Sequence, residues 1–152
     1  MQTITIIIGL PGSGKTTYIK NNSEKFRNAV ICDDYDKSTD ARKHSHDFKS
    51  SIYYQDLKNA LLNNKDVVLT DISWCRKEMR EALKDNLEKM LKEFKINAQI
   101  NFIYFENNPE ACKKNILKRN REDRTEREIE LIDRLSSLYV IPDKFIPILI
   151  TV

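Results

Sequence analysis

The chain has 152 residues, enough for one domain with a central sheet covered on both faces and too few for a second catalytic domain. Its formal net charge is only +3, so composition alone does not indicate a nucleic-acid-binding protein. Three cysteines without a C-x-x-C pair, Cys32, Cys75 and Cys112, argue against a disulfide framework or a zinc site and favour reduced intracellular thiols.

The first predicted element is a buried strand over residues 4–8. This apolar run is too short to span a membrane and lacks a basic leader, so we expect neither a membrane segment nor a signal peptide, and a cytoplasmic location.

The strand leads directly into Gly9-Leu10-Pro11-Gly12-Ser13-Gly14-Lys15-Thr16, which matches G-x-x-x-x-G-K-[ST] at every fixed position. This pattern predicts a phosphate-binding loop, because glycines allow backbone N–H groups to point inward around a phosphate. Lys15 is expected to reach the β and γ phosphates, and the Thr16 hydroxyl can ligate Mg²⁺. A helix from Thr17 to about Phe26 then places its positive end under the charge. We therefore expect ATP or another nucleoside triphosphate to bind here.

A second short strand, residues 29–32, ends at Asp33 and Asp34. One of these carboxylates can face the γ-phosphate and orient an acceptor hydroxyl. The alternative is an aspartate pair that caps the next turn, and the pattern alone leaves both interpretations open.

Helical spacing over residues 52–61 predicts a helix that ends near Asn63 and Asn64, before a third strand over residues 66–71. Asp71 closes this strand and can hold Mg²⁺ directly or through water. The alternative role is an N-cap for the segment that begins near Ser73, and both roles can hold at once.

The second half of the chain continues the alternation of helices and strands. An amphipathic helix is predicted from Met79 to Phe94, and the apolar run 100–105 predicts a strand buried on both faces. Asn108-Pro109-Glu110 opens the next helix, and Thr125-x-x-Glu128 is a capping box for the last one. Pro142 ends that helix, and residues 145–152 predict a final strand interrupted only by Pro147.

This alternation predicts an α/β fold with a five-stranded, mostly parallel sheet and helices on both faces. Ligands of such sheets collect at the carboxyl ends of the strands, where the loop, Asp33 and Asp71 all fall. No repeat or linker interrupts the pattern, so residues 1–152 are expected to form a single domain.

The densest basic segment lies between two predicted helices, at about residues 113–127. It suits an arginine-rich lid that closes over the triphosphate and presents guanidinium groups to it. The alternative is a solvated, salt-bridged helix face. The candidate lid cations include Arg119, Arg121 and Arg124.

With these motifs the chain resembles the small P-loop kinases of the polynucleotide 5′-hydroxyl kinase type, and the resemblance extends over the whole chain. It is carried by residues 9–17, by Cys32-Asp33-Asp34-Tyr35, by residues 67–73 and by the arginine-rich lid. It implies a P-loop NTPase fold in which Asp33 is the general base on the 5′-hydroxyl. The family's Asp-Thr-Asn is similar to Asp71-Ile72-Ser73. At the position where the family has a basic residue that contacts the acceptor phosphate, this chain has Asp36.

The resemblance also implies where each ligand binds. Arg119 and Arg124 resemble the catalytic lid arginines, and Asp34, Asp71 and Ser73 match the acceptor side. The expected triphosphate-binding set is Gly9, Pro11, Gly12, Ser13, Gly14, Lys15, Thr16, Thr17 and Arg121, and the expected Mg²⁺ ligands are Thr16 and Asp71.

The expected function is transfer of the γ-phosphate of ATP to a 5′-hydroxyl end of DNA or RNA. A kinase of nucleosides, nucleotides or other small hydroxyl compounds is the first alternative, supported by the nearly neutral charge. A nucleotide-switched module that hydrolyses ATP slowly to control a partner is the second, and several arginines in cis disfavour it. We expect neither a membrane nor a disulfide-linked partner.

Overall fold

A computed structural model describes residues 1–33, 47–119 and 123–152 of the chain. Four strands alternate with five α-helices in these ranges: β1 Gln2–Ile8, α1 Lys15–Asn21, β2 Ala29–Cys32, α2 Tyr54–Leu62, β3 Asp66–Thr70, α3 Lys77–Glu93, β4 Ala98–Tyr104, α4 Pro109–Arg119 and α5 Thr125–Ser136. Two 3-10 turns, η3 Phe48–Ser50 and η4 Ile72–Cys75, precede α2 and α3. The predicted α/β alternation is confirmed.

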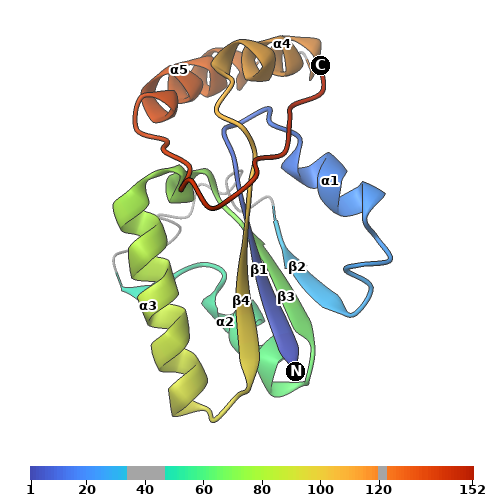
Figure 1. Cartoon of the computed structure of the whole chain (residues 1–152), viewed down its shortest axis with the longest axis vertical. Helices are drawn as coiled ribbons and strands as arrows, with labels where there is room; N and C mark the ends of the chain where they lie inside the picture. Colours follow the sequence, from blue (N-terminus) through green and yellow to red (C-terminus); the bar gives the residue numbers. More distant parts are fainter. Residues whose placement is uncertain (34–46, 120–122) are drawn as a thin grey trace.

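The strands form one parallel sheet in the order β2-β3-β1-β4. Ile4 pairs with Val67 on one side and with Ile100 on the other, so β1 lies inside the sheet. This order brings the carboxyl ends of all four strands to one edge, where the chain enters the glycine-rich loop (Figure 1).

The sheet has four strands, so the prediction of five was wrong. Residues 145–152 form only an isolated parallel bridge between Phe105 and Ile148. Ile148 N–H donates to Tyr104 O at 2.8 Å, and Glu106 N–H donates to Ile148 O at 2.9 Å. Pro147 has no N–H with which to extend the ladder, and Ile146 is 94% exposed.

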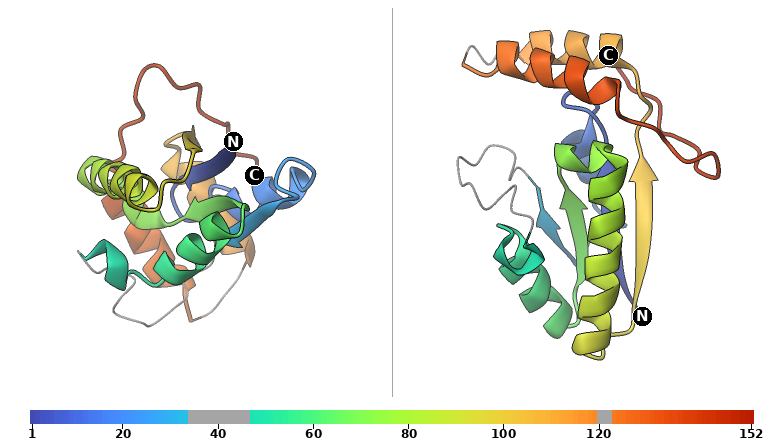
Figure 2. Two further views of the ribbon diagram at one scale, coloured as in Figure 1. Left: turned by 90° about the horizontal axis from the view of Figure 1, so that it is seen from below. Right: turned by 90° about the vertical axis from the view of Figure 1, so that its left-hand side faces the viewer.

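Helices cover both faces of the sheet, as expected, although unequally (Figures 1 and 2). Leu57 of α2 and Leu87 of α3 join Ile4 and Ile6 in the larger hydrophobic cluster, whereas Tyr18 and Ile19 of the short α1 pack on the opposite face. Strand β4 is an edge strand, and its side chains before Tyr104 are half-buried or exposed. The prediction that this strand is buried on both faces was therefore wrong.

Helices α4 and α5 form a hairpin across the carboxyl edge of the sheet (Figure 2). The Tyr139 hydroxyl, just beyond α5, donates to Phe105 O at 2.5 Å, which ties the hairpin to the sheet. The Asn115 side chain of α4 donates to Gly12 O at 3.0 Å and to Thr151 O at 2.9 Å. The hairpin is thus anchored to the glycine-rich loop and to the last residues of the chain.

The predicted capping box at the start of α5 was wrong. Helix α5 begins at Thr125 itself, and Arg124 stands at the N-cap without a side-chain cap hydrogen bond. Glu128 N–H donates to Arg124 O at 2.9 Å, which is an ordinary helical bond rather than a bond to a capping hydroxyl. The Glu128 side chain is consequently available for another contact.

None of the helices in the described ranges is long and apolar enough to cross a lipid bilayer.

Candidate functional site

The glycine-rich loop joins the end of β1 to the start of α1. Gly12 and Gly14 have φ values of 81° and 101°, a left-handed conformation that residues with a Cβ rarely adopt. Gly14 is the N-cap of α1 and provides no side-chain cap, so the first N–H groups of the helix have no capping side chain. Helix α1 spans Lys15–Asn21, so it begins two residues before the predicted start and ends five residues before the predicted end. Thr16 and Thr17 therefore lie in its first turn.

The Lys15 side chain folds back over the loop. Its Nζ donates to Gly9 O at 2.8 Å and to Leu10 O at 3.1 Å. Ser13 N–H donates to Leu10 O at 3.1 Å and closes the turn. The loop thus holds a cation beside the first N–H groups of a helix, and these groups fit the phosphates that the sequence predicts.

A cavity of about 320 Å³ lies above this loop, and three parts of the fold line it. The loop and α1 contribute Pro11, Gly12, Gly14, Lys15, Thr16, Thr17 and Lys20. The ends of β2 and β3 contribute Asp33, Thr70, Asp71 and Ile72. The hairpin contributes Arg119, Arg124 and Glu128. The cavity therefore brings together most of the charged residues that the sequence analysis selected.

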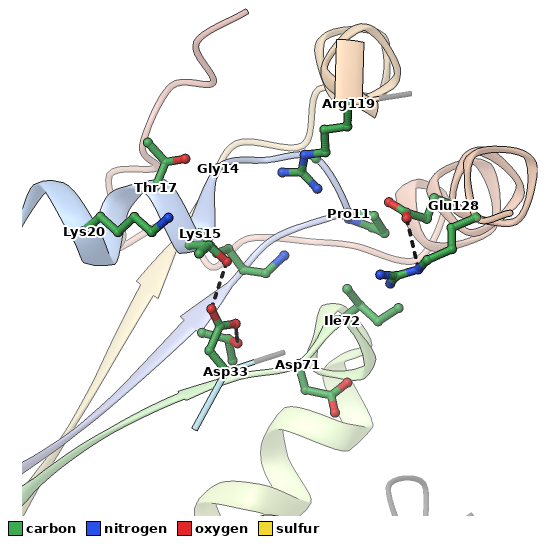
Figure 3. A pocket seen from close by; sticks show the side chains of 14 residues that line it. Pro11, Gly14, Lys15, Thr17, Lys20, Asp33, Asp71, Ile72, Arg119 and Glu128 are labelled. Carbon is green, nitrogen blue, oxygen red and sulfur yellow. Dashed lines mark hydrogen bonds and ion pairs between the residues drawn. The ribbon is translucent and has the colours of Figure 1, made fainter. Parts of the chain in front are cut away.

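The carboxylate of Asp33 reaches the threonine of the phosphate loop (Figure 3). Its Oδ2 accepts a hydrogen bond from Thr16 Oγ1 at 2.8 Å, and its Oδ1 accepts one from Thr70 Oγ1 at 2.5 Å. Two hydroxyl groups on different elements thus fix both oxygens of this carboxylate. Asp33 therefore lies in the cavity lining, directly beside the hydroxyl of the phosphate loop.

The Asp71 carboxylate does not share the contact that Asp33 makes with Thr16. It is buried, and its Oδ1 accepts from the Ser73 backbone N–H at 2.8 Å, which makes it the N-cap of η4. Figure 3 shows its carboxylate turned away from Asp33. The capping interpretation of Asp71 is therefore confirmed, and Asp33 is the strand-end acid that contacts Thr16. Ser73 itself does not line the cavity.

Two of the described lid arginines, Arg119 and Arg124, reach the cavity. Arg119 projects from the end of α4 toward the loop (Figure 3). Arg124 Nε lies 3.5 Å from Glu128 Oε1. The salt-bridge alternative also holds for part of this segment, because Lys113 Nζ and Asp133 Oδ1 pair at 2.6 Å between the two helices. Asp34 and Arg121, which the sequence analysis selected as well, lie outside the described residues.

Among the polar and charged residues of the cavity, sequence reasoning missed three: Lys20, Thr70 and Glu128. Lys20 could have been found, because it lies four residues after Thr16 and hence on the same face of the helix. Thr70 gave a weaker signal, since it ends an apolar strand with a hydroxyl. Glu128 was assigned to the capping box instead.

Hard oxygen donors make the cavity suitable for Mg²⁺ bound to a triphosphate. The Thr16 hydroxyl is placed to be a direct ligand, and the Asp33 carboxylate beside it can hold a metal-bound water. No group of three His, Cys, Asp or Glu side chains that could hold a metal occurs in the described ranges.

A second hollow of about 420 Å³ adjoins the first, between α1, α4 and the last residues of the chain. Tyr18, Asn115, Arg119 and Thr151 are among its lining residues, together with Ser13 of the loop. It combines polar groups with the apolar side chains of Phe105 and Ile148.

Two buried thiols lie beside the phosphate loop. Burial raises the pKa of Cys75 to about 12 and that of Cys112 to about 11, against a smaller lowering by the Lys15 charge. Both thiols are therefore neutral near physiological pH, which leaves them unsuited to nucleophilic or metal-binding roles. The oxygen and nitrogen groups of the cavity remain to carry the chemistry.

Comparison with known proteins agrees with this geometry. The family model described as AAA domain, a P-loop NTPase-like kinase family, matches residues 4–140. An uncharacterized protein of Acanthamoeba polyphaga mimivirus is 30% identical over 141 residues, which cover 91% of this chain and 86% of that protein.

Proposed function

The chain belongs to the AAA domain family and is a P-loop kinase-like enzyme, and from that premise we propose that it transfers the γ-phosphate of ATP to the 5′-hydroxyl end of DNA or RNA. The observation that carries the proposal is the Asp33 carboxylate, which two hydroxyl groups hold at the floor of the cavity above the phosphate loop.

The donor half of the proposed site consists of the loop and the hairpin. The backbone of the loop holds the β-phosphate, and Lys15 exchanges its carbonyl partners for phosphate oxygens. Arg119 and Arg124 approach the same cavity from the hairpin and stabilise the charge that develops on the transferred group. Mg²⁺, with Thr16 as a ligand, would neutralise the triphosphate when bound.

The acceptor half centres on Asp33. Its carboxylate accepts the proton of the attacking hydroxyl while the oxygen–phosphorus bond forms and the bond from the γ-phosphorus to the β-bridging oxygen breaks. ADP is the leaving group and a 5′-phosphorylated end is the product. Thr70 keeps the carboxylate oriented for this transfer.

One observation favours a second candidate, a kinase of small hydroxyl compounds. Two further carboxylates, Asp71 and Glu128, line the cavity. They would repel the internucleotide phosphates of an oligonucleotide, whereas an uncharged small acceptor would bring no such charge.

Transfer of radiolabel from γ-labelled ATP to a panel of acceptors tests the proposal. The panel contains a 5′-hydroxyl oligodeoxyribonucleotide, its oligoribonucleotide counterpart, nucleosides and small polyols. The same oligonucleotides with 5′-phosphates are the matched controls, and Lys15→Ala is the inactive enzyme control.

We expect label on the 5′-hydroxyl oligonucleotides alone. Label on a small compound but not on oligonucleotides would replace the proposal by the second candidate. ATP hydrolysis that no acceptor stimulates would support a nucleotide-switched module instead.

A further inference from the structure

Glu128 occupies a position in α5 where an apolar residue would be expected. The buried residues of this helix are Glu128, Ile132 and Leu135, spaced so that all three lie on the face that packs against the protein. Glu128 is only 8% exposed. Glutamate is rarely buried to this degree unless it has a charged partner, so its placement at the head of an apolar stripe requires an explanation.

The buried carboxylate lies in an unfavourable place for triphosphate binding. Glu128 lines the same cavity as Lys15, Arg119 and Arg124. Its negative charge would repel phosphate oxygens there, and the low local dielectric strengthens that repulsion. A residue that served packing alone would not need this charge.

The partner of Glu128 is Arg124, one helical turn earlier. Arg124 Nε lies 3.5 Å from Glu128 Oε1 (Figure 3), and the Glu128 backbone N–H donates to Arg124 O at 2.9 Å. The backbone bond is the ordinary helical one, so the ion pair is the contact that relates the Arg124 guanidinium to the Glu128 carboxylate. A contact through Nε engages one edge of the guanidinium plane, whereas bidentate phosphate recognition uses paired N–H groups of the fork.

We propose that Glu128 is a positioning residue that aims the Arg124 guanidinium at the transferred phosphate, an inference that rests on the phosphotransfer proposed above. The pair differs from Lys113–Asp133, another ion pair of the hairpin, in which the aspartate side chain is 62% exposed and neither residue lines the cavity. Lys113 and Asp133 join two helices, whereas Arg124 and Glu128 face the site of the reaction.

Substitution of Glu128 by glutamine tests this role, with Glu126→Gln as the matched control. Glu126 lies in the first turn of the same helix, is exposed and is not among the cavity residues, so both variants lose one negative charge from one helical turn. Three quantities are measured for each protein: the affinity for a non-hydrolysable ATP analogue with Mg²⁺, kcat for transfer, and ATP hydrolysis without an acceptor.

We expect Glu128→Gln to lower kcat by about 10- to 100-fold, because a misplaced catalytic group costs rate in this range. ATP-analogue affinity should be unchanged or higher, because a negative charge has been removed from the phosphate cavity. Glu126→Gln should behave like the wild type. In Arg124→Ala, the additional Glu128→Gln change should have no further effect on kcat, since the residue that it positions is gone.

A second variant guards against misfolding at the buried position. Arg124→Lys keeps the positive charge but removes the Nε contact and the guanidinium fork, and we expect a similar loss of kcat with retained affinity. Glu128→Gln with wild-type kcat, or with effects that add fully to those of Arg124→Ala, would overturn the proposal.

The hydrolysis measurement separates the two proposals. A wild-type protein that hydrolyses ATP but phosphorylates no acceptor would refute the phosphotransfer function, whereas a Glu128→Gln protein with unaltered hydrolysis would refute the positioning role. A wild-type protein that neither binds nor hydrolyses ATP would contradict both.

Discussion

Replacement of Thr70 by valine removes one of the two hydrogen bonds that hold Asp33 while it keeps the branched shape of the side chain. Thr70 is 5% exposed and donates to Asp33 Oδ1 at 2.5 Å. A hydrogen bond to a charged group contributes about 1.5–3 kcal/mol. If that energy orients the carboxylate in the transition state, its loss lowers kcat by about 10- to 150-fold, since about 1.4 kcal/mol corresponds to a factor of ten.

Steady-state transfer from γ-labelled ATP measures this effect, with ATP-analogue affinity determined in parallel. Thr70→Ser is the matched control, because it keeps the hydroxyl and should retain most of the wild-type kcat. Affinity should change little in either variant, since the triphosphate contacts proposed above come from the loop and the hairpin. A valine variant with wild-type kcat would show that Thr70 does not orient Asp33 and would refute the reasoning.

Three other predictions concern stability and reactivity. Gly12→Ala should lower the free energy of unfolding by about 2–5 kcal/mol. An alanine in the left-handed conformation costs about 1–2 kcal/mol, and the clash of its Cβ, which would lie 2.5 Å from Cys112 O, costs about 1–3 kcal/mol more. An unchanged urea midpoint would contradict this prediction. The Cys75 and Cys112 thiols should resist a thiol-specific disulfide reagent at pH 8 until the protein is unfolded. Burial raises the pKa of the Cys75 thiol from 9.0 to about 12, so this thiol loses its proton at a lower pH in the unfolded state than in the folded state. The urea midpoint should therefore fall as the pH rises above about 9. A midpoint that rises or stays constant would contradict the raised pKa of Cys75.

Local sequence patterns were sufficient for most of the fold. Strand β1, the helix that follows the loop and the strand that ends near Asp71 each rest on contiguous apolar or helical spacing, which local chemistry determines. Whether a segment pairs with the edge of a sheet depends on contacts that are distant in the sequence. Residues 145–152 have strand-forming composition, yet Pro147 removes a donor and only Ile148 pairs with the end of β4.

The site illustrates the same limit. Both Asp33 and Asp71 end apolar strands, and the sequence does not contain the strand order and side-chain direction that bring Asp33 to Thr16 and turn Asp71 to the Ser73 backbone. Glu128 matched a capping box by its spacing from Thr125, but burial against the cavity and the contact with Arg124 are tertiary features. The phosphate-loop motif is contiguous in the sequence, whereas the contacts of Asp33, Asp71 and Glu128 depend on the packed structure.

The Asp33→Asn variant, compared with the wild type in a single-turnover transfer assay and in an ATP-binding assay, tests the central claim most directly. Asparagine keeps the size of the side chain and can still accept a hydrogen bond from a threonine, but it cannot take a proton from the acceptor hydroxyl. We expect phosphoryl transfer to be abolished while ATP binding with Mg²⁺ is retained. Full transfer activity in Asp33→Asn would contradict the assignment of Asp33 as the general base.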